Sequence, residues 1–374
     1  ISTSADRARS VYATDVDGDG DMDILTASYS DDKIAWYEND GSESFTEHVI
    51  STSADGARSV YATDVDGDGD MDVLSASIYD DKIAWYEQDG VYPTYIPDDN
   101  FEQALIDLGY DDVIDDYVLT ENISGITSLD VSDKEISDLT GIEGFTTLTI
   151  LSCHYNTLTA LDVSANPALT TLYCAANQLT ALDVSANPAL TVLSCYGNDL
   201  TTLDVSANPA LTSLSCSDNQ LTNLDVNNNT GLTTLTCNRN QLTNLGVSNN
   251  TLLEHLSTQN NNITSLDVSS NTALIEFRCD VNQLTYLNMR NGVTDQITLF
   301  NAMNNLLDCI EVNAGDVDYA TTNWTSDNGN IDDGVIFANI CSSNPNVTYV
   351  PDDNFEQALI DLGYDDTLDD YVLT

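Results

Sequence analysis

Apolar positions recur with a fixed period of 21 residues along the middle of this chain. The stretch LTALDVSANPALTTLYCAANQ, from Leu158 to Gln178, returns almost unchanged in the turns that follow it. Its spaced leucines predict one short strand in each turn, and one such strand cannot bury its apolar side alone. The pattern therefore predicts a solenoid, in which only the stacked array of turns has a core.

The spacing L-x-x-L-x-L-x-x-N-x-L is that of leucine-rich repeats. We therefore expect a mainly β repeat protein, with a leucine-rich-repeat solenoid of 21-residue turns over residues 143–308. Residues 95–142 should form a helical N-terminal cap and the first repeat, and residues 309–345 the C-terminal cap, because an open solenoid end exposes its core. Residues 349–374 nearly repeat the sequence from Tyr95 to Thr120 and predict the start of a second solenoid module.

The N-terminal cap contains the helix-forming sequence PDDNFEQALIDLGY. Asp98 or Asp99 is expected to cap this helix at its first turn. Phe101, Leu105 and Leu108 are spaced to share one face of the helix.

A second repeat, of 49 residues, occupies residues 1–90, with copies that begin at Ile1 and Ile50. The segments SVYAT, DILTAS, KIAWYE and SFTEHVIS of the first copy predict four strands, the content of one propeller blade. The second copy lacks the SFTEHVIS strand, as expected of a propeller that closes by borrowing a strand from its other end. Two blades do not close a ring, so we expect further blades before Ile1 and regard the chain as a piece of a longer protein.

Each of these repeats carries an acidic glycine loop. The aspartates stand at alternate positions: Asp15, Asp17, Asp19, Asp21 and Asp23 in the first copy, and Asp64, Asp66, Asp68, Asp70 and Asp72 in the second. Carboxylates spaced in this way converge on one point and offer the hard oxygen ligands that suit Ca²⁺. An EF-hand would need Glu at the twelfth position, where Thr26 and Ser75 stand. The alternative to a calcium site is a solvated acidic turn.

These loops and their flanking strands resemble the FG-GAP/VCBS family of β-propeller repeats, whose D-x-D-G-D-G-x-x-D loop binds calcium. The resemblance implies that the aspartate side chains coordinate the ion, except that Asp21 and Asp70 contribute their carbonyl groups. We expect Ca²⁺ to be a structural cofactor, because all of its ligands come from one loop.

The segments NFEQALIDLGY, ITSLDVSDKEISDLTGIEGF and LTALDVSANPALTTLYC resemble bacterial leucine-rich repeats of the internalin type. They resemble more closely those of secreted surface proteins of Bacteroidetes. The resemblance covers roughly residues 95–341 and implies extracellular binding or adhesion, often with export by a type IX secretion system.

Six of the eight cysteines follow the 21-residue period: Cys153, Cys174, Cys195, Cys216, Cys237 and Cys279, with Thr258 interrupting the series. Each occupies an inward position of its turn, where a free thiol packs as a small apolar group. Stacked parallel Cβ vectors disfavour disulfides between turns, so we expect these thiols to be reduced. Cys309 and Cys341 lie outside the series and are the expected disulfide, which suits a secreted protein.

Composition narrows the classes of partner. The 62 acidic and 9 basic residues give a formal charge of −53, which repels nucleic acid and anionic membranes. No apolar run is long enough to cross a bilayer. The three histidines, His48, His154 and His255, are too scattered for a catalytic triad or a metal site. We therefore do not expect an enzyme.

Two polar series follow the solenoid period. The repeat asparagines Asn156, Asn177, Asn198, Asn219, Asn240, Asn261, Asn282 and Asn304 are expected to bond the backbone of neighbouring turns. An acidic series comprises Asp162, Asp183, Asp204, Asp225 and Asp267. A plain solvated edge is favoured for it over a site that collects cations.

Ligand contact is expected at outward positions of the concave strip, where exposed Tyr and Arg are typical of binding hot spots. The candidates are His154, Tyr155, Tyr173, Tyr196, Arg239 and Arg278. The leading hypothesis is a secreted or cell-surface calcium-binding adhesin that binds a protein or glycan. One alternative is the non-catalytic accessory region of a surface polysaccharide-degrading enzyme. The other is a structural stalk or filament of self-associating tandem modules.

Overall fold

The computed structural model describes residues 1–2, 5–16, 21–39, 41, 44–66, 71–87, 93–341, 347–350, 352–362 and 371–373. The chain divides into two compact units. The first comprises residues 1–95 and 115–123, and the second comprises residues 96–114 and 124–374.

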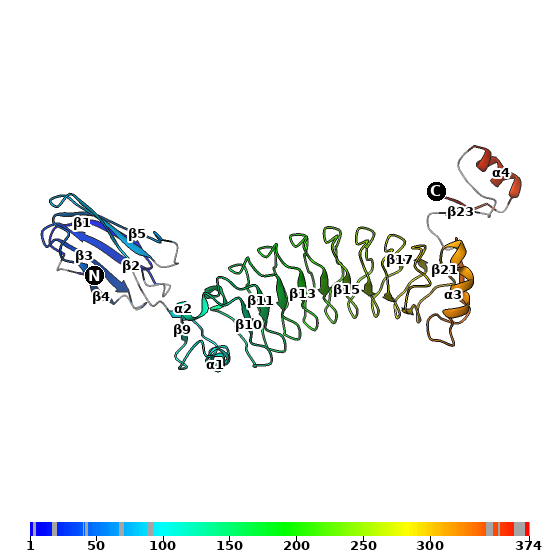
Figure 1. Cartoon of the computed structure of the whole chain (residues 1–374), viewed down its shortest axis with the longest axis horizontal. Coiled ribbons are helices and arrows are strands. Elements are labelled where there is room, and N and C mark those ends of the chain that lie inside the picture. Colours follow the sequence, from blue (N-terminus) through cyan, green and yellow to red (C-terminus); the bar gives the residue numbers. More distant parts are fainter. Residues whose placement is uncertain are drawn as a thin grey trace. The chain divides into compact units, whose positions relative to one another are not determined.

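Each 49-residue repeat forms one antiparallel sheet in the first unit (Figure 1). Blade 1 consists of β1 (Ala8–Thr14), β2 (Asp23–Ser28), β3 (Lys33–Asn39) and β4 (Phe45–Ser51). Blade 2 consists of β5 (Ala57–Thr63), β6 (Asp72–Ser77) and β7 (Lys82–Tyr86). The four strands expected from the first copy are therefore present, and the described residues of the second copy form three.

The second unit begins with the expected cap helix, α1 (Asp99–Leu108). Asp98 is its N-cap, and one carboxylate oxygen accepts the backbone N–H groups of Asn100 and Phe101, each at 3.0 Å. Phe101 and Leu105 are fully buried, whereas Leu108, in the last turn before Gly109 ends the helix, is 45% exposed.

The other carboxylate oxygen of Asp98 joins the helix to the first turn of the solenoid. It accepts the Ser137 N–H at 2.8 Å, the Ser137 hydroxyl at 2.7 Å and the Asp138 N–H at 3.0 Å. Strand β8 (Pro93–Tyr95) precedes α1 in the sequence and β9 (Tyr117–Leu119) follows it, and the two strands pair with each other. The short helix α2 (Thr120–Ile123) comes directly after β9.

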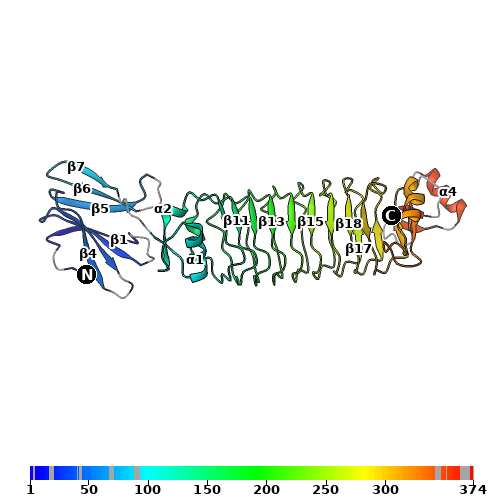
Figure 2. The same ribbon diagram turned by 60° about the horizontal axis from the view of Figure 1, so that its bottom comes forward.

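The solenoid is built on a parallel sheet of nine short strands, one from each turn, stacked in sequence order (Figures 1 and 2). Its members are β10 (Ser128–Asp130), β11 (Ile150–Ser152), β12 (Thr171–Tyr173), β13 (Val192–Ser194), β14 (Ser213–Ser215), β15 (Thr234–Thr236), β16 (His255–Ser257), β18 (Glu276–Arg278) and β20 (Leu299–Asn301). The central residue of each strand is Leu or Phe and is buried, which forms the predicted shared core.

Two ladders of buried asparagines hold the turns together. In the predicted ladder, the side chain of Asn177 accepts the Leu158 N–H at 3.0 Å and donates to the carbonyls of Cys153 and Cys174. A second ladder was not predicted from the sequence: Asn187 is fully buried and donates to the carbonyls of Val163 and Asn166, both at 2.9 Å. Its members are Asn166, Asn187, Asn208, Asn229, Asn250 and Asn271.

The predicted role of Asn304 was wrong. Asn305 instead accepts the Leu284 N–H at 3.1 Å and donates to the carbonyls of Cys279 and Ala302. The spacing from Asn282 to Asn305 is two residues longer than the usual period, because the turn between β18 and β20 is longer.

A second parallel sheet begins in the last turns, from β17 (Ser265–Asp267) and β19 (Tyr286–Asn288) to β21 (Cys309–Glu311) and β22 (Ile336–Ala338). Beyond β21, the 3₁₀ turn η2 (Ala314–Asp316) and the helix α3 (Val317–Asn323) cover the end of the core. The cap is centred on Trp324, which is 5% exposed and whose ring lies 4.3 Å from that of Phe300. One further 3₁₀ turn, η1 (Ile142–Gly144), lies in the first repeats.

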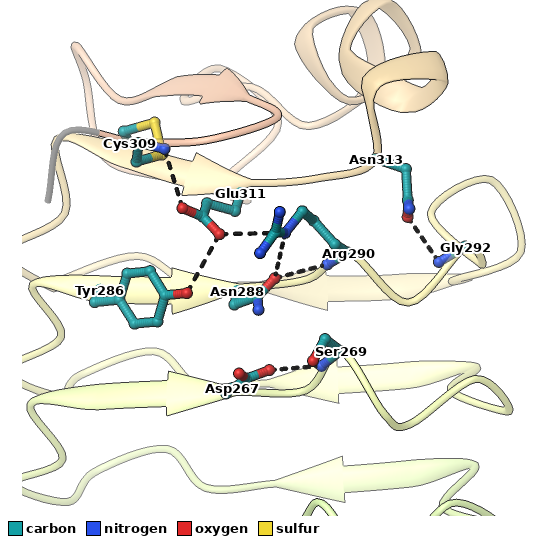
Figure 3. A network of polar contacts seen from close by, with 10 residues as sticks. Asp267, Ser269, Tyr286, Asn288, Arg290, Gly292, Cys309, Glu311 and Asn313 are labelled. Atoms are coloured by element: carbon teal, nitrogen blue, oxygen red, sulfur yellow. Dashed lines mark hydrogen bonds and ion pairs between the residues drawn. A yellow bond between two sulfur atoms is a disulfide. The ribbon is translucent and has the colours of Figure 1, made fainter. Parts of the chain in front are cut away.

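Glu311, which is fully buried, ties this cap together (Figure 3). One carboxylate oxygen accepts the Cys341 N–H at 3.0 Å, and the other accepts the Tyr286 hydroxyl at 3.2 Å and pairs with Arg290 Nε at 3.3 Å. Burial, followed by the nearby charge of Glu311, raises the pKa of Tyr286, which therefore remains a hydrogen-bond donor.

The C-terminal segment repeats the arrangement around α1. Strand β23 (Val347–Tyr349) pairs with β24 (Tyr371–Leu373) in the register of β8 with β9. Between them, α4 (Asp353–Asp361) has Asp352 as its N-cap, in the place of Asp98.

Candidate functional site

The acidic loop of blade 2 gathers carboxylates around one point. Oxygen atoms of Asp64, Asp66 and Asp72 all lie within 4.8 Å of one another. Asp72 begins β6 and is fully buried, and it accepts the Val65 N–H at 2.9 Å, which folds the loop back on itself. Three converging carboxylates form the type of donor set that a hard divalent cation requires, so these residues fit Ca²⁺. The remaining predicted ligands, Asp68 and Asp70, lie outside the described residues.

The loop of blade 1 closes in the same way. Asp23 begins β2 and is fully buried, and it accepts the Val16 N–H and the Asn39 N–H, both at 2.8 Å. Asp15 and Asp21 flank the loop, and Asp17 and Asp19 lie outside the described residues. In both copies, the last aspartate of the loop thus accepts the backbone N–H of the valine that follows the first aspartate.

The nine-stranded sheet presents the largest regular surface of the solenoid. The central side chain of each strand points inward, so its two neighbours point outward. From β11 to β18 the outward pairs are Ile150/Ser152, Thr171/Tyr173, Val192/Ser194, Ser213/Ser215, Thr234/Thr236, His255/Ser257 and Glu276/Arg278. Most side chains in this row carry a hydroxyl group, and only Tyr173 and Arg278 among them were predicted from the sequence as contact residues. In the sequence, this row could have been found as the pair of residues that flank the central apolar residue of each strand.

Most of the predicted aromatic contact residues come together at the N-terminal end of this surface. The hydroxyls of Tyr155 and Tyr196 lie 3.1 Å apart, and the ring of His154 is 5.4 Å from that of Tyr155. Tyr155 is 54% exposed and Tyr173 is 37% exposed. Tyr155 and the half-buried Tyr196 thus meet at their hydroxyls, and Tyr173 lies on β12 in the turn between them.

The two predicted arginines lie in later turns and apart from each other. Arg239 Nη1 pairs with Asp218 Oδ1 at 3.3 Å, and both side chains are largely exposed. Arg278 lines a hollow of about 430 Å³ with Phe300, Asn301 and the loop 328–330. The structure therefore separates a tyrosine pair, an exposed ion pair and an arginine-lined hollow along one solenoid.

The acidic series is exposed and locally bonded. Asp162, Asp183 and Asp204 each accept the backbone N–H of the serine two residues later, at 2.9 Å. Hydrogen bonds from these serines lower the pKa of all three carboxyls, so they are ionised at neutral pH.

The six periodic cysteines are free and buried. Burial raises the pKa of Cys153, Cys195 and Cys237 to about 12, which keeps these thiols protonated and chemically inert. Thr258 takes the vacant place in the series, and its hydroxyl donates to the Arg278 carbonyl at 3.3 Å. Cys309 and Cys341 are joined by a disulfide, with their Cα atoms 5.9 Å apart.

Within the described parts of the chain, none of the helices combines the length and the apolar character needed to cross a membrane.

The one-strand turns, the buried asparagine ladder and the end caps define a leucine-rich-repeat solenoid. It is preceded by antiparallel sheets, and a family model described as an FG-GAP-like repeat matches residues 15–75. The solenoid is similar to internalins in two comparisons.

Internalin J of Listeria monocytogenes serotype 4b (strain F2365) is 43% identical over 72 residues, which are 19% of this chain and 8% of that protein. A solved structure of the functional domain of InlJ from Listeria monocytogenes is described as including a cysteine ladder. It is 40% identical, with a TM-score of 0.53, and the match covers 58% of this chain and 50% of that chain. The chain thus spans half or less of the length of these relatives.

Proposed function

We propose that this chain is part of a secreted or cell-surface, adhesin-type protein that binds an extracellular protein or glycan through the exposed face of its parallel sheet. The observation that carries this proposal is the tyrosine pair Tyr155–Tyr196 with the exposed Tyr173 in the turn between them, because accessible aromatic side chains dominate the binding energy of many interfaces. The similarity to Internalin J supports a surface location and a role in protein binding. The resemblance to Bacteroidetes surface proteins suggests export by a type IX system.

We also propose that Ca²⁺ is bound in both acidic loops and has a structural role. The convergence of Asp64, Asp66 and Asp72 supports this assignment. The equivalent backbone hydrogen bonds to Asp23 and Asp72 support it for the first loop as well. Bound calcium would neutralise part of the repulsion between the closely spaced carboxylates of each loop.

A screen of glycan and surface-protein arrays, made with the whole chain in calcium, tests the binding proposal. A hit should weaken at least about tenfold when Tyr155 or Tyr196 is changed to Ala. Tyr319→Ala is the matched control, because Tyr319 is exposed to the same extent as Tyr173 but lies on α3. A hit that survives both substitutions would contradict the assignment of the site.

A second candidate function is a structural stalk of tandem modules. It is favoured by the repetition of the strand–helix–strand unit in β23, α4 and β24. Arrays without any hit would favour this function over adhesion.

A further inference from the structure

The outward surface of the nine-stranded sheet changes its chemistry at the C-terminal end. From β13 to β16, the outward residue that follows the central leucine is neutral and carries a hydroxyl group: Ser194, Ser215, Thr236 and Ser257. Arg278 takes this position on β18, and Asn301 takes it on β20. A row of hydroxyl groups therefore leads to a single guanidinium group.

The charge of Arg278 is not neutralised by direct contact with a carboxylate. Arg239 and Arg290 each pair with a carboxylate, whereas Arg278 is exposed and forms no ion pair with any residue that the structure describes. Glu276, the other outward residue of β18, has its carboxylate 3.6 Å from His255 Nδ1 instead. The planar guanidinium of Arg278 is thus free to bind a carboxylate of a ligand with two parallel hydrogen bonds.

The hollow beside Arg278 has mostly polar walls. Its volume of about 430 Å³ falls within the usual range of ligand pockets, roughly 300–1,000 Å³. Thr298, Asn301 and the loop 328–330 line it together with Arg278. Phe300 also lines it but is only 4% exposed, so the hollow offers little aromatic surface to an apolar anchor.

The loop 328–330 is fixed to the last strand of the sheet. The Asn330 carbonyl accepts the Ala302 N–H at 2.7 Å, and the Asn330 side-chain amide donates to the Phe300 carbonyl at 2.8 Å. Hydrogen bonds to the backbone on both sides of Phe300 and Ala302 hold this wall in place, so the hollow is formed before a ligand arrives.

Two amide side chains in the hollow keep hydrogen-bonding atoms for a ligand. Asn301 Oδ1 accepts the Met303 N–H at 3.0 Å, and no described residue accepts a hydrogen bond from Asn301 Nδ2. Asn328 Nδ2 donates to the Asn323 carbonyl at 3.1 Å, and no described residue donates to Asn328 Oδ1. One donor and one acceptor of this kind suit hydroxyl groups, which both donate and accept.

We propose that this hollow binds the terminal sugar of a glycan through a carboxylate on that sugar, which pairs with Arg278. The amides of Asn301 and Asn328 bind hydroxyl groups of the same sugar, and the row of hydroxyl side chains contacts the sugars that follow. The inference rests on the proposed function, because it assigns a glycan to the exposed face of the sheet. It adds a contact region separate from the tyrosine pair.

The negative charge of the chain restricts the ligand to one carboxylate. At physiological ionic strength, interactions between exposed charges are largely screened beyond about 8 Å. A single carboxylate in contact with Arg278 therefore interacts mainly with that guanidinium, whereas a polyuronate would also bring charges close to the acidic surface. Burial raises the pKa of the nearby Asp280 and the charge of Arg278 opposes this shift, yet the two side chains form no ion pair.

A glycan array probed with the whole chain tests the proposal. Each glycan that ends in a uronic or sialic acid is printed beside a counterpart whose carboxyl group is reduced to an alcohol. The reduced glycans should bind at least about tenfold more weakly, because a charge-assisted bidentate pair is lost. Arg278→Gln should lower the binding of the carboxylated glycans to the level of the reduced ones, and the substitution should not unfold the protein because the side chain is exposed.

Lys134→Gln is the matched control, because it removes the same charge from an exposed side chain at the other end of the solenoid. It should bind like the wild type. Equal binding of carboxylated and reduced glycans, or wild-type binding by Arg278→Gln, would overturn the proposal.

The same variants separate this inference from the proposed function. If protein ligands bind in a manner that depends on Tyr155 or Tyr196 while no carboxylated glycan binds, this inference fails and the proposed function stands. A chain that binds neither proteins nor glycans contradicts both.

Discussion

Each solenoid turn requires one residue with a left-handed backbone just before its ladder asparagine. The residues at this position are Tyr155, Ala176, Gly197, Asp218, Arg239, Asn260, Val281 and Asn304, with φ between 52° and 66°. Glycine adopts this conformation without strain, whereas side chains, and β-branched ones above all, are disfavoured there. Among these left-handed positions only Gly197 is a glycine, so several of the turns carry local strain.

Val281→Gly should therefore stabilise the solenoid. The residue is 41% exposed, so little buried surface is lost, and relief of its left-handed strain is expected to raise the free energy of unfolding by about 1 kcal/mol. Urea denaturation followed by circular dichroism measures this change. Gly197→Val, the reverse change at the equivalent position, should lower stability, because valine is strained at a φ of 66°. A Cβ at Gly197 would meet Ala176 at an ordinary contact distance of 3.5 Å, so the loss would come from the backbone and not from a clash.

Asp98 makes the N-terminal cap sensitive to acid. Burial opposes ionisation of Asp98, but hydrogen bonds from Ser137, Phe101 and Asp138 outweigh it and lower the pKa of the carboxyl. A lowered folded-state pKa stabilises the fold above the unfolded value of about 3.9, and this stabilisation is lost as the pH falls through the folded-state pKa.

Asp98→Asn should consequently lower the free energy of unfolding at pH 7 by about 1–3 kcal/mol, because the amide cannot accept all five hydrogen bonds. Its difference from the wild type should shrink as the pH falls below about 4. Unfolding midpoints of both proteins between pH 7 and pH 3 provide the measurement. A constant difference over this range would contradict the role given to Asp98.

Among the secondary-structure elements, each solenoid strand has only three residues and is too short to be stable alone. Contacts with the residues around it therefore hold it in place. A buried thiol or Thr258 directly follows each strand of the nine-stranded sheet from β11 to β18, and the two asparagine ladders bond the loops on either side. The sequence pattern predicted the thiols and one ladder, because both recur in a single conspicuous position. It did not reveal the second ladder, since asparagine in an A-N-P segment is equally typical of an exposed turn.

Thiol reactivity should separate the ladder from the C-terminal disulfide. The six ladder thiols should not react with an alkylating reagent in the native state at pH 8, because they are buried and their pKa values are raised well above this pH. Denaturant without reductant should expose six thiols, and added reductant should expose all eight. Eight thiols without reductant would show that Cys309 and Cys341 are not bridged in the isolated protein.

At the scale of the whole molecule, the two units depend on different interactions. The first unit has a small apolar core between two blades and two loops rich in carboxylates. The second has a continuous core of leucines along its turns and carries the disulfide. The proposed calcium sites therefore belong to the first unit.

Removal of calcium should destabilise the first unit alone. A ligand that binds only the folded state raises the melting temperature, so chelation should lower the transition of the blades and leave that of the solenoid nearly unchanged. Trp36 and Trp85 lie in the blades and Trp324 in the cap, so tryptophan fluorescence of a Trp324→Phe variant follows the blades selectively. Equal losses in both units would contradict the loop assignment, and Asp72→Asn should abolish part of the response to calcium.

The architecture follows from the periods of the amino-acid sequence. A period of 21 fixes one strand for each turn, and a period of 49 fixes the strands of the blades, because a repeated pattern of apolar positions has few ways to bury itself. The same periods indicated the acidic loops and the candidate tyrosines, although the individual roles of these residues stay predictions.

Which of two equivalent residues is buried and which is exposed depends on the tertiary contacts of each one. Ile34 and Ile83 have the same sequence surroundings, yet one is buried and the other is exposed, because blade 2 covers the first and no described element covers the second. Asn305 rather than Asn304 continues the ladder because one turn is longer. Burial and contact depend on what lies beside a residue in space, and a repeated sequence carries no record of where the repetition ends.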